Sequence, residues 1–240
     1  MNRVAMITGA SRGLGKTLAS FLAAQGYALI LSARHNAALE AATQEMRRFG
    51  GRVIAVPGDV SDPGHRHALV EAALSLGRLD LLVNNASILG ASPLPPLTSY
   101  PIETLEQILA VNTLAPLALI QDLIELLKLS AGLVVNISSD AAAGGYPGWG
   151  GYGASKAALD LITLTLARES DDRRLAFVSV DPGDMRTQMH QDAFPGEDIS
   201  DRPRPEVTIP FWAWLLGQEH ATIHGQRFQA QSEIWTTANG

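Results

Sequence analysis

The fold of this chain is decided near its N-terminus by the stretch Val4-Ala5-Met6-Ile7-Thr8-Gly9-Ala10-Ser11-Arg12-Gly13-Leu14-Gly15. The apolar run 3–8 ends at a glycine and is typical of a buried strand, while 14–25 has helical spacing and stops at Gly26. Gly9, Gly13 and Gly15 allow a tight turn and a close approach of the backbone to a pyrophosphate, and the following helix offers free N–H groups there. A glycine-rich turn without a ligand would look similar in isolation, but its place between the first strand and the first helix favours a dinucleotide-binding loop.

The same alternation of apolar runs and helical patterns continues along the chain. Further strands are expected at 28–32, 52–56, 79–83, 133–137, 175–180 and 226–230, and further helices at 37–49, 65–76, 102–129, 152–169 and 206–216. Because the strands are apolar on both faces, the pattern predicts an α/β fold, in which helices cover both sides of a doubly wound parallel sheet. With no internal repeat and no linker, we expect a single domain over residues 1–240, with an irregular substrate loop around 184–205.

Composition narrows the function further. The chain has 240 residues, of which 46% are hydrophobic and 18% charged, and it contains no cysteine, which excludes disulfides, thiolate metal sites and a cysteine nucleophile. A net charge of −6 argues against nucleic acid and anionic membranes as partners. The chain has neither an uninterrupted apolar run of about 20 residues nor a signal-peptide pattern, so a cytoplasmic location is expected. We interpret His65 and His67 as surface residues and predict no metal site.

The end of the second predicted strand indicates which dinucleotide binds. NAD sites usually place an acid there for the ribose 2′-hydroxyl, but this chain reads Ser32-Ala33-Arg34 and has no acid before Glu40. Arg12 and Arg34 could each bind a 2′-phosphate through two hydrogen bonds. The pattern therefore favours NADP(H) over NAD(H), the alternative being that Arg34 is a solvated loop residue.

The strongest chemical signal is Ser139 followed 13 residues later by Tyr152, with Lys156 one helical turn beyond. Tyr152 and Lys156 share a helix face. We expect the ammonium to lower the phenol pKa from its usual value near 10, so that Tyr152 can exchange a proton near neutrality. Ser139, just past a strand, can hydrogen-bond the same reacting oxygen. A chance Tyr-x-x-x-Lys is common on helices, but the added serine and glycine loop indicate catalysis.

Two further positions have local physical arguments. Pro116 lacks an N–H group, so the carbonyl of Asn112 has no helical partner and could bind a water molecule, the alternative being a simple helix kink. Asp59 and the segment 84–86 follow predicted strands, at the sheet edge where ligands bind in this architecture. Taken alone, Asp59 would be read as a helix cap.

Taken together, the motifs resemble those of the classical short-chain dehydrogenase/reductase family over roughly residues 3 to 230. They are the Thr-Gly-x-x-x-Gly-x-Gly loop at 8–15, Asp59, Asn84-Asn85-Ala86, Asn112, Ser139, Tyr152, Lys156 and Pro182-Gly183 followed by Thr187. The resemblance implies a Rossmann-like sheet of about seven strands in the order 3-2-1-4-5-6-7. It also implies hydride transfer between a nicotinamide and a carbonyl or alcohol.

The resemblance also implies roles for individual residues. Tyr152 would be the catalytic acid/base, Ser139 would polarise the carbonyl, Lys156 would hold the nicotinamide ribose, and Asn112 would hold a relay water. The implied cofactor-binding residues are Gly9, Ser11, Arg12, Gly13, Leu14, Gly15, Arg34, Asp59 and Val60 at the adenine, Asn85, Ala86, Tyr152, Lys156, Pro182, Gly183, and Thr187 at the nicotinamide amide.

Three features depart from the pattern of that family, one of them the stretch 223–228, which lacks the acid-Gly-Gly sequence that many relatives carry there. Ser87 stands where the family often has glycine, so this loop could sit differently. Asp140 follows Ser139 where small residues are commoner, and it brings a negative charge close to the site or points to solvent.

The sequence indicates the substrate less clearly than the cofactor. We expect the pocket walls to come from 87–97, 141–149 and 185–194, with Tyr146, Trp149, Met185 and Met189 binding substrate beside Ser139 and Tyr152. These mostly apolar walls favour a small or medium uncharged carbonyl or alcohol, although several of them could simply pack the core. The rival reading is a non-catalytic NADP-binding sensor or scaffold, which would have no need of Ser139, Tyr152 and Lys156.

The helices predicted at 102–129 and 152–169 look too apolar for one covered face each. A second apolar stripe could come from Leu105, Ile108, Leu109, Leu117, Leu123, Leu159, Ile162 and Leu166. Such a stripe, and the family resemblance, predict a homodimer or homotetramer.

Overall fold

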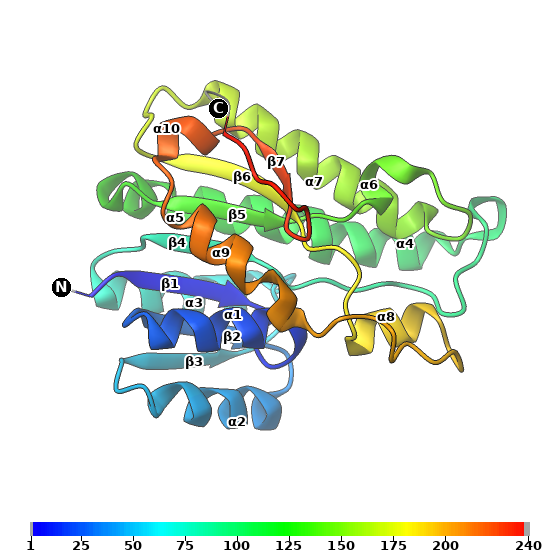
Figure 1. Ribbon diagram of the computed structural model, residues 1–240, viewed down its shortest axis with the longest axis horizontal. Helices are drawn as coiled ribbons and strands as arrows, with labels where there is room; N and C mark the ends of the chain where they lie inside the picture. Colours follow the sequence, from blue (N-terminus) through cyan, green and yellow to red (C-terminus); the bar gives the residue numbers. More distant parts are fainter. Residues whose placement is uncertain (1, 238–240) are drawn as a thin grey trace.

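The computed structural model describes residues 2–237, which form a seven-stranded sheet in the order β3-β2-β1-β4-β5-β6-β7 (Figure 1). The strands are β1 Val4–Thr8, β2 Ala28–Ala33, β3 Val53–Pro57, β4 Leu81–Asn84, β5 Leu133–Ile137, β6 Ala176–Asp181 and β7 Arg227–Gln229. All neighbouring strands pair in parallel. The predicted fold class and strand order are therefore confirmed.

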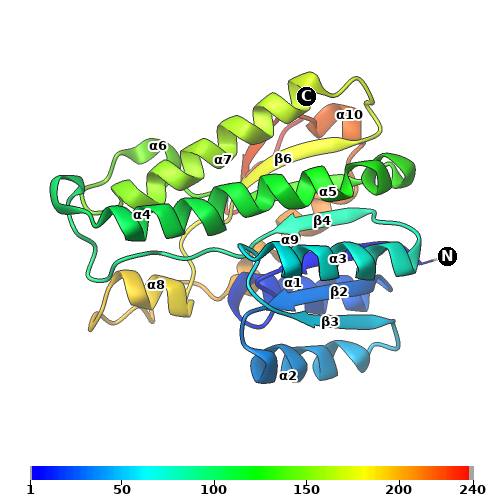
Figure 2. The ribbon, with the colours of Figure 1, turned by 180° about the vertical axis from the view of Figure 1, so that it is seen from behind.

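Helices cover both faces of this sheet, as Figures 1 and 2 show from opposite sides. They are α1 Gly13–Ala24, α2 Asn36–Arg47, α3 Pro63–Leu76, α4 Ile102–Leu109, α5 Ala115–Ser130, α6 Ala141–Gly144, α7 Gly150–Glu169, α8 Gln188–Ala193, α9 Ile209–Leu215 and α10 His220–Ile223. The helices α1, α2 and α9 pack on one face, and α3, α5 and α7 on the other. Because every side chain of β1, β2, β5 and β6 is buried, the strands read as continuous apolar runs.

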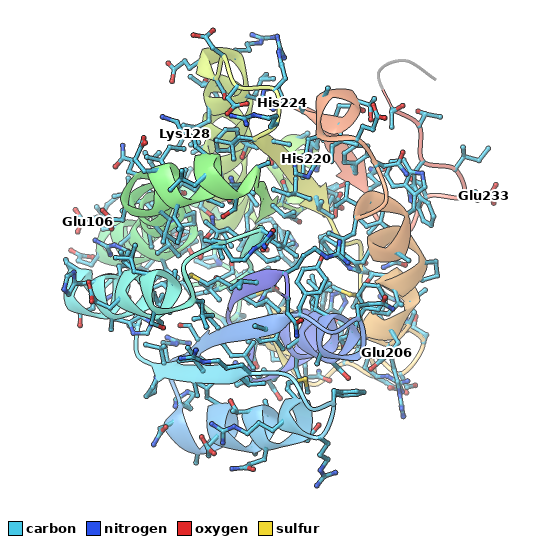
Figure 3. All side chains as sticks on the ribbon, turned by 90° about the vertical axis from the view of Figure 1, so that its left-hand side faces the viewer. Glu106, Lys128, Glu206, His220, His224 and Glu233 are labelled. Carbon is cyan, nitrogen blue, oxygen red and sulfur yellow. The ribbon has the colours of Figure 1, made fainter. Side chains whose placement is uncertain are left out.

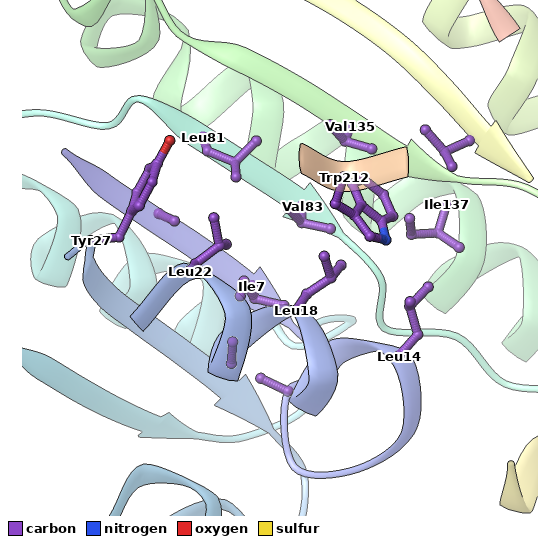
Figure 4. Close-up of a cluster of buried hydrophobic side chains, with 14 of the residues drawn as sticks. Ile7, Leu14, Leu18, Leu22, Tyr27, Leu81, Val83, Val135, Ile137 and Trp212 are labelled. Atoms are coloured by element: carbon purple, nitrogen blue, oxygen red, sulfur yellow. The ribbon is translucent and has the colours of Figure 1, made fainter. Parts of the chain in front are cut away.

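The core under α1 and α9 includes Trp212, whose side chain lies in one buried cluster with Leu18, Val83 and Val135 (Figure 4). Trp212 is 2% exposed, and its indole N–H donates to the Thr208 hydroxyl at 3.0 Å. The one polar atom of this large side chain is thus satisfied, which a buried tryptophan requires. This packing ties the C-terminal segment to the glycine-loop side of the sheet.

The stretch 184–205 is less irregular than predicted, because it contains the six-residue helix α8. The Thr187 hydroxyl caps this helix by accepting from the His190 backbone N–H at 3.2 Å. Phe194 at its end packs on His190, with ring centroids 5.0 Å apart. A helix this short has too few apolar positions to show a periodic pattern, which explains why the sequence did not reveal it.

The predicted helix 102–129 is one helical path, Ile102–Ser130, with the π-helical turn η2 at Ala110–Leu114. By length and composition its 29 residues could cross a membrane, but half of the most apolar window is buried in the protein, as in a core helix. The predicted second stripe is partly wrong, because Ile108, Leu123 and Leu159 lie in the core. The exposed apolar residues of α4, η2 and α7 are instead Ile102, Leu114 and Leu161.

The prediction that His65 is a surface residue is also wrong. His65 is 6% exposed, and its Nε2 lies 2.8 Å from the Ser32 hydroxyl. It fits because Gly58 faces it: a Cβ on that glycine would lie 2.3 Å from the His65 ring. His67 is exposed, as predicted. Within residues 2–237 no group of three or more potential metal-ligating side chains was found.

Candidate active site

The carboxyl ends of the parallel strands point to the side of the sheet where α8 lies (Figure 1). A cavity of about 860 Å³ opens at that edge of the sheet. Most of the predicted site residues line it: Gly9, Ser11, Arg12, Gly13, Leu14, Arg34, Asp59, Val60, Asn85, Ala86, Tyr152, Lys156, Pro182, Met185, Thr187 and Met189. Six predicted site residues lie outside the lining: Gly15, Asn112, Ser139, Tyr146, Trp149 and Gly183. The tertiary structure thus gathers residues from the whole length of the chain into one continuous space.

The glycine loop needs its glycines for space and for backbone angles. Gly9 has φ +67°, and a Cβ there would lie 2.9 Å from the Ala86 backbone. A Cβ on Gly15 would lie 2.4 Å from the Gly9 carbonyl oxygen, which explains why Gly15 supports the loop from behind. The helix α1 begins at Gly13 without a side-chain cap from Arg12. Its first N–H groups are therefore available to an anion in the cavity.

The loops after β1 and β4 are joined by hydrogen bonds. The Thr8 hydroxyl accepts from the backbone N–H groups of Asn85 and Ala86, at 3.0 Å each. In return the Asn85 side-chain amide donates to the carbonyls of Thr8 and Gly9, at 2.8 and 3.1 Å. Asn85 thereby fixes the wall opposite the glycine loop.

At the far end of the cavity, Arg12 and Arg34 are both exposed on its rim. Asp59 lines the cavity from the loop between β3 and α3. Its carboxylate accepts from the Ser61 backbone N–H at 2.9 Å and the Ser61 hydroxyl at 2.7 Å. Burial raises the pKa of Asp59, but these hydrogen bonds and the charge of Arg34 together lower it. The lowered pKa keeps Asp59 ionised, and its negative charge interacts favourably with the positive charge of Arg34.

Tyr152 and Lys156 lie at the other end and are almost fully buried, with 8% and 2% exposure. The Lys156 ammonium donates to the Ile137 carbonyl at 2.7 Å and lies 5.5 Å from the centre of the Tyr152 ring. Burial lowers the pKa of Lys156 to about 8.

The predicted lowering of the Tyr152 pKa does not appear in this structure, because burial instead raises it. Desolvation disfavours the phenolate more strongly than the neighbouring groups favour it. The hydroxyl of Ser87 partly opposes this effect, while the charges of Asp181 and Asp140 add to it.

Asn112 lies in the π-helical turn and is fully buried. Its side chain holds the loop after β4, accepting from the Ile88 N–H at 2.9 Å and donating to the Ile88 carbonyl at 3.0 Å. It also donates to the Ser155 hydroxyl on α7 at 3.0 Å. The side chain is thus structural, and the role of the Asn112 carbonyl in holding a water molecule stays a prediction.

Ser139 lies outside the cavity lining, and among residues 2–237 its hydroxyl makes no hydrogen bond to Tyr152. Its hydroxyl donates to the Asp140 carboxylate at 3.0 Å and accepts from the Ala141 N–H at 3.2 Å. The preceding Ser138 does line the cavity, but its hydroxyl donates to Asp160 at 2.7 Å. The acid at position 140 therefore competes for the hydroxyl that the sequence pattern assigns to substrate.

Trp149 and Tyr146, the two aromatic residues predicted to bind substrate beside Tyr152, lie outside the cavity lining. Trp149 packs edge-on against Tyr152, with ring centroids 5.8 Å apart, and contacts Phe194 beside α8 at 6.1 Å. Tyr146 is 45% exposed, and a hydrogen bond to Asp140 raises its phenol pKa. Met185 and Met189 line the cavity directly, as predicted.

Sequence reasoning missed part of the lining, including the ion pair of Lys16 and Glu45 at 2.8 Å. Further unpredicted lining residues are Thr17, Ser20, His35, Gly58, Val111, Ile137, Ser138 and Glu206, whereas Arg186, Gln188, Arg204 and Pro205 fall within the predicted substrate loop. Glu206 lies on the segment leading into α9, beside α1, where it accepts a 3.4 Å hydrogen bond from Thr17 (Figure 3). No local motif marks these positions, because only the folding of the chain brings them to the cavity.

Comparisons with known proteins agree with this geometry. The family described as short chain dehydrogenase matches residues 3–198. The chain is 31% identical to the oxidoreductase YciK of Escherichia coli K12, over 96% of this chain and 92% of the relative. It is 30% identical to cyclohexanol dehydrogenase from Acinetobacter sp., over 95% and 92%.

Solved structures give the same result. A short chain dehydrogenase from Pseudomonas syringae has a TM-score of 0.89 at 33% identity, covering 95% of this chain and 94% of its own. One from Escherichia coli CFT073, complexed with NADPH, has a TM-score of 0.86 at 30% identity, covering 97% and 98%. These matches show that the chain belongs to the classical short-chain dehydrogenase/reductase family and is an oxidoreductase.

Proposed function

We propose that this protein is an NADP(H)-dependent carbonyl reductase, or alcohol dehydrogenase in the reverse direction, with the whole chain acting as one catalytic domain. The observation that carries the proposal is the single cavity that Arg12 and Arg34 line together with the buried pair Tyr152 and Lys156. Such a space suits an elongated dinucleotide beside an acid/base group. The complex of a similar protein with NADPH supports this choice of cofactor.

The residues of the cavity fit that cofactor. The glycine loop and the first turn of α1 would hold the pyrophosphate, and Arg12 and Arg34 would hold the 2′-phosphate. Asp59 and Val60 would contact the adenine, Lys156 the nicotinamide ribose and Thr187 the nicotinamide amide. When bound, the reduced nicotinamide supplies the hydride for the carbonyl carbon.

The protein supplies the proton. In the reduction, Tyr152 donates its phenol proton to the substrate oxygen, and its raised pKa keeps that proton in place until charge develops there. Lys156 stabilises the resulting tyrosinate, since its ammonium lies 5.5 Å from the centre of the Tyr152 ring. Ser139 would polarise the same oxygen after its hydroxyl leaves Asp140.

The substrate wall favours an uncharged, partly apolar carbonyl compound. Met185, Met189 and Ile88 line the cavity, and Met189 packs in the hydrophobic cluster that contains Tyr152. We also propose a homodimer or homotetramer, formed through helices that expose Ile102 and Leu161 at 61% and 65%.

The test is Tyr152→Phe, which removes the phenol oxygen and its proton. We expect NADPH oxidation by a panel of aldehydes, ketones and quinones to fall to background, while NADPH still binds. Tyr27→Phe is the matched control, since Tyr27 is buried in the core away from the cavity lining. A Tyr152→Phe rate above a tenth of the wild-type rate would contradict the acid/base assignment. Wild-type protein that binds NADPH but reduces nothing in the panel would favour the sensor reading.

A further inference from the structure

Ser87 occupies a rigidly held position at the Tyr152 end of the cavity. On one side, the Ala86 N–H donates to the Thr8 hydroxyl at 3.0 Å. On the other side, Ile88 exchanges two hydrogen bonds with the Asn112 side chain, at 2.9 and 3.0 Å. Because both neighbours are fixed, the place of the Ser87 side chain is set by β1 and by the π-helical turn.

The hydroxyl of Ser87 is buried, yet it has no hydrogen-bond partner of regular geometry among residues 2–237. The other serines around Tyr152 have partners: Ser138 donates to Asp160, Ser139 to Asp140, and Ser155 to the Tyr152 carbonyl. A buried hydroxyl without a partner is destabilising, and such groups are concentrated at functional sites. Ser87 lines the same cavity as Tyr152, and its side chain is close enough to the phenol to act on it as a hydrogen-bonding group.

We propose that Ser87 is a positioning residue whose hydroxyl hydrogen-bonds the phenol oxygen of Tyr152 and stabilises the tyrosinate during proton transfer. The proposal rests on the function proposed above. In the reduction, the Tyr152 O–H bond breaks, its proton joins the substrate oxygen, and Ser87 keeps its own proton while donating to the tyrosinate. Ser87 thus gives the Tyr152 phenol a hydrogen-bond partner while the Ser139 hydroxyl is bonded to Asp140.

The charges around Tyr152 make this partner useful. Lys156 on α7 faces the ring, whereas Asp140 before α6 and Asp181 at the end of β6 both disfavour the tyrosinate. Burial disfavours it further, and the Ser87 hydroxyl acts in the opposite direction by lowering the Tyr152 pKa. A glycine at position 87 would leave the phenolate without this contribution.

The first experiment is the pH profile of alcohol oxidation by the NADP⁺ complex, in which Tyr152 must be deprotonated. In Ser87→Ala and Ser87→Gly, we expect the acid limb of the kcat/KM profile to move upward by about one pH unit. At pH values on that limb, kcat/KM should therefore fall about tenfold. Ser87→Thr keeps the hydroxyl and should retain the wild-type limb. The KM for NADP⁺ should stay unchanged. Ser99→Ala is the control, because Ser99 lies in the same loop but outside the cavity lining.

The second experiment needs no turnover. With tyrosine labelled at Cζ by ¹³C, the Tyr152 resonance is identified by its loss in Tyr152→Phe. Ser87→Ala should move that resonance, and Ser99→Ala should not. An unmoved resonance together with an unshifted pH profile in Ser87→Ala would overturn the proposal while leaving the function intact. If the wild type has no turnover, the function fails, and the resonance alone decides whether Ser87 contacts Tyr152.

Discussion

Removing the Arg34 guanidinium is expected to weaken the binding of NADPH much more than the binding of NADH. A charge-assisted hydrogen bond to phosphate contributes roughly 1.5–3 kcal/mol. Arg34 and Arg12 are both exposed on the cavity rim, so solvent screening places each at the lower end of that range. About 1.5 kcal/mol corresponds to a little more than tenfold in affinity. We therefore expect Arg34→Ala to weaken NADPH binding about tenfold and to leave NADH almost unaffected, because NADH has no 2′-phosphate.

The assay compares fluorescence titrations and kcat/KM with both cofactors. Wild-type protein should prefer NADPH by at least about tenfold, and this preference should shrink as ionic strength rises. Arg48→Ala is the matched control, since it removes the same charge from the end of α2, outside the cavity lining. Equal losses for NADPH and NADH in Arg34→Ala would refute the reasoning, placing Arg34 on the adenine or in the fold. The NADP(H) assignment would then rest on Arg12 alone.

Three further outcomes are expected. Gly15→Ala should abolish NADPH binding and lower the melting temperature, because its Cβ would lie 2.4 Å from the Gly9 carbonyl oxygen, whereas Gly217→Ala, with 3.4 Å to its nearest atom, should change neither. The Lys156 pKa falls from 10.5 to about 8 on folding, so the unfolded chain holds more protons between these values and stability rises with pH there. In urea unfolding, the free energy of unfolding of the wild type relative to Lys156→Met should rise by up to about 1.4 kcal/mol per pH unit within that window, and this rise should vanish below about pH 8. A difference that does not change with pH would contradict the burial effect. Light scattering at micromolar concentration should give two or four times 25.5 kDa, and a mass near 25.5 kDa itself would refute the proposed oligomer.

Much of the fold could be predicted because its signals are local. The apolar run before Gly9 and the glycines at 13 and 15 specify a strand, a turn and a helix within a few residues of one another. The strand order was implied by resemblance and is confirmed. The short helix α8 escaped prediction because one hydroxyl cap and one aromatic contact define it, and neither produces a periodic pattern.

The sequence by itself determined which chemical groups are available: a phenol, an amine, a glycine loop and two arginines beside it. Only the tertiary structure decided the burial and the hydrogen-bond partners of those groups. Burial reversed the expected direction of the Tyr152 pKa shift, and the Asp140 carboxylate took the Ser139 hydroxyl. His65 became a core residue because Gly58 leaves room for it. Residue types and spacings are written along the chain, but desolvation and hydrogen-bond competition depend on atoms brought together from distant segments, so they appear only after folding.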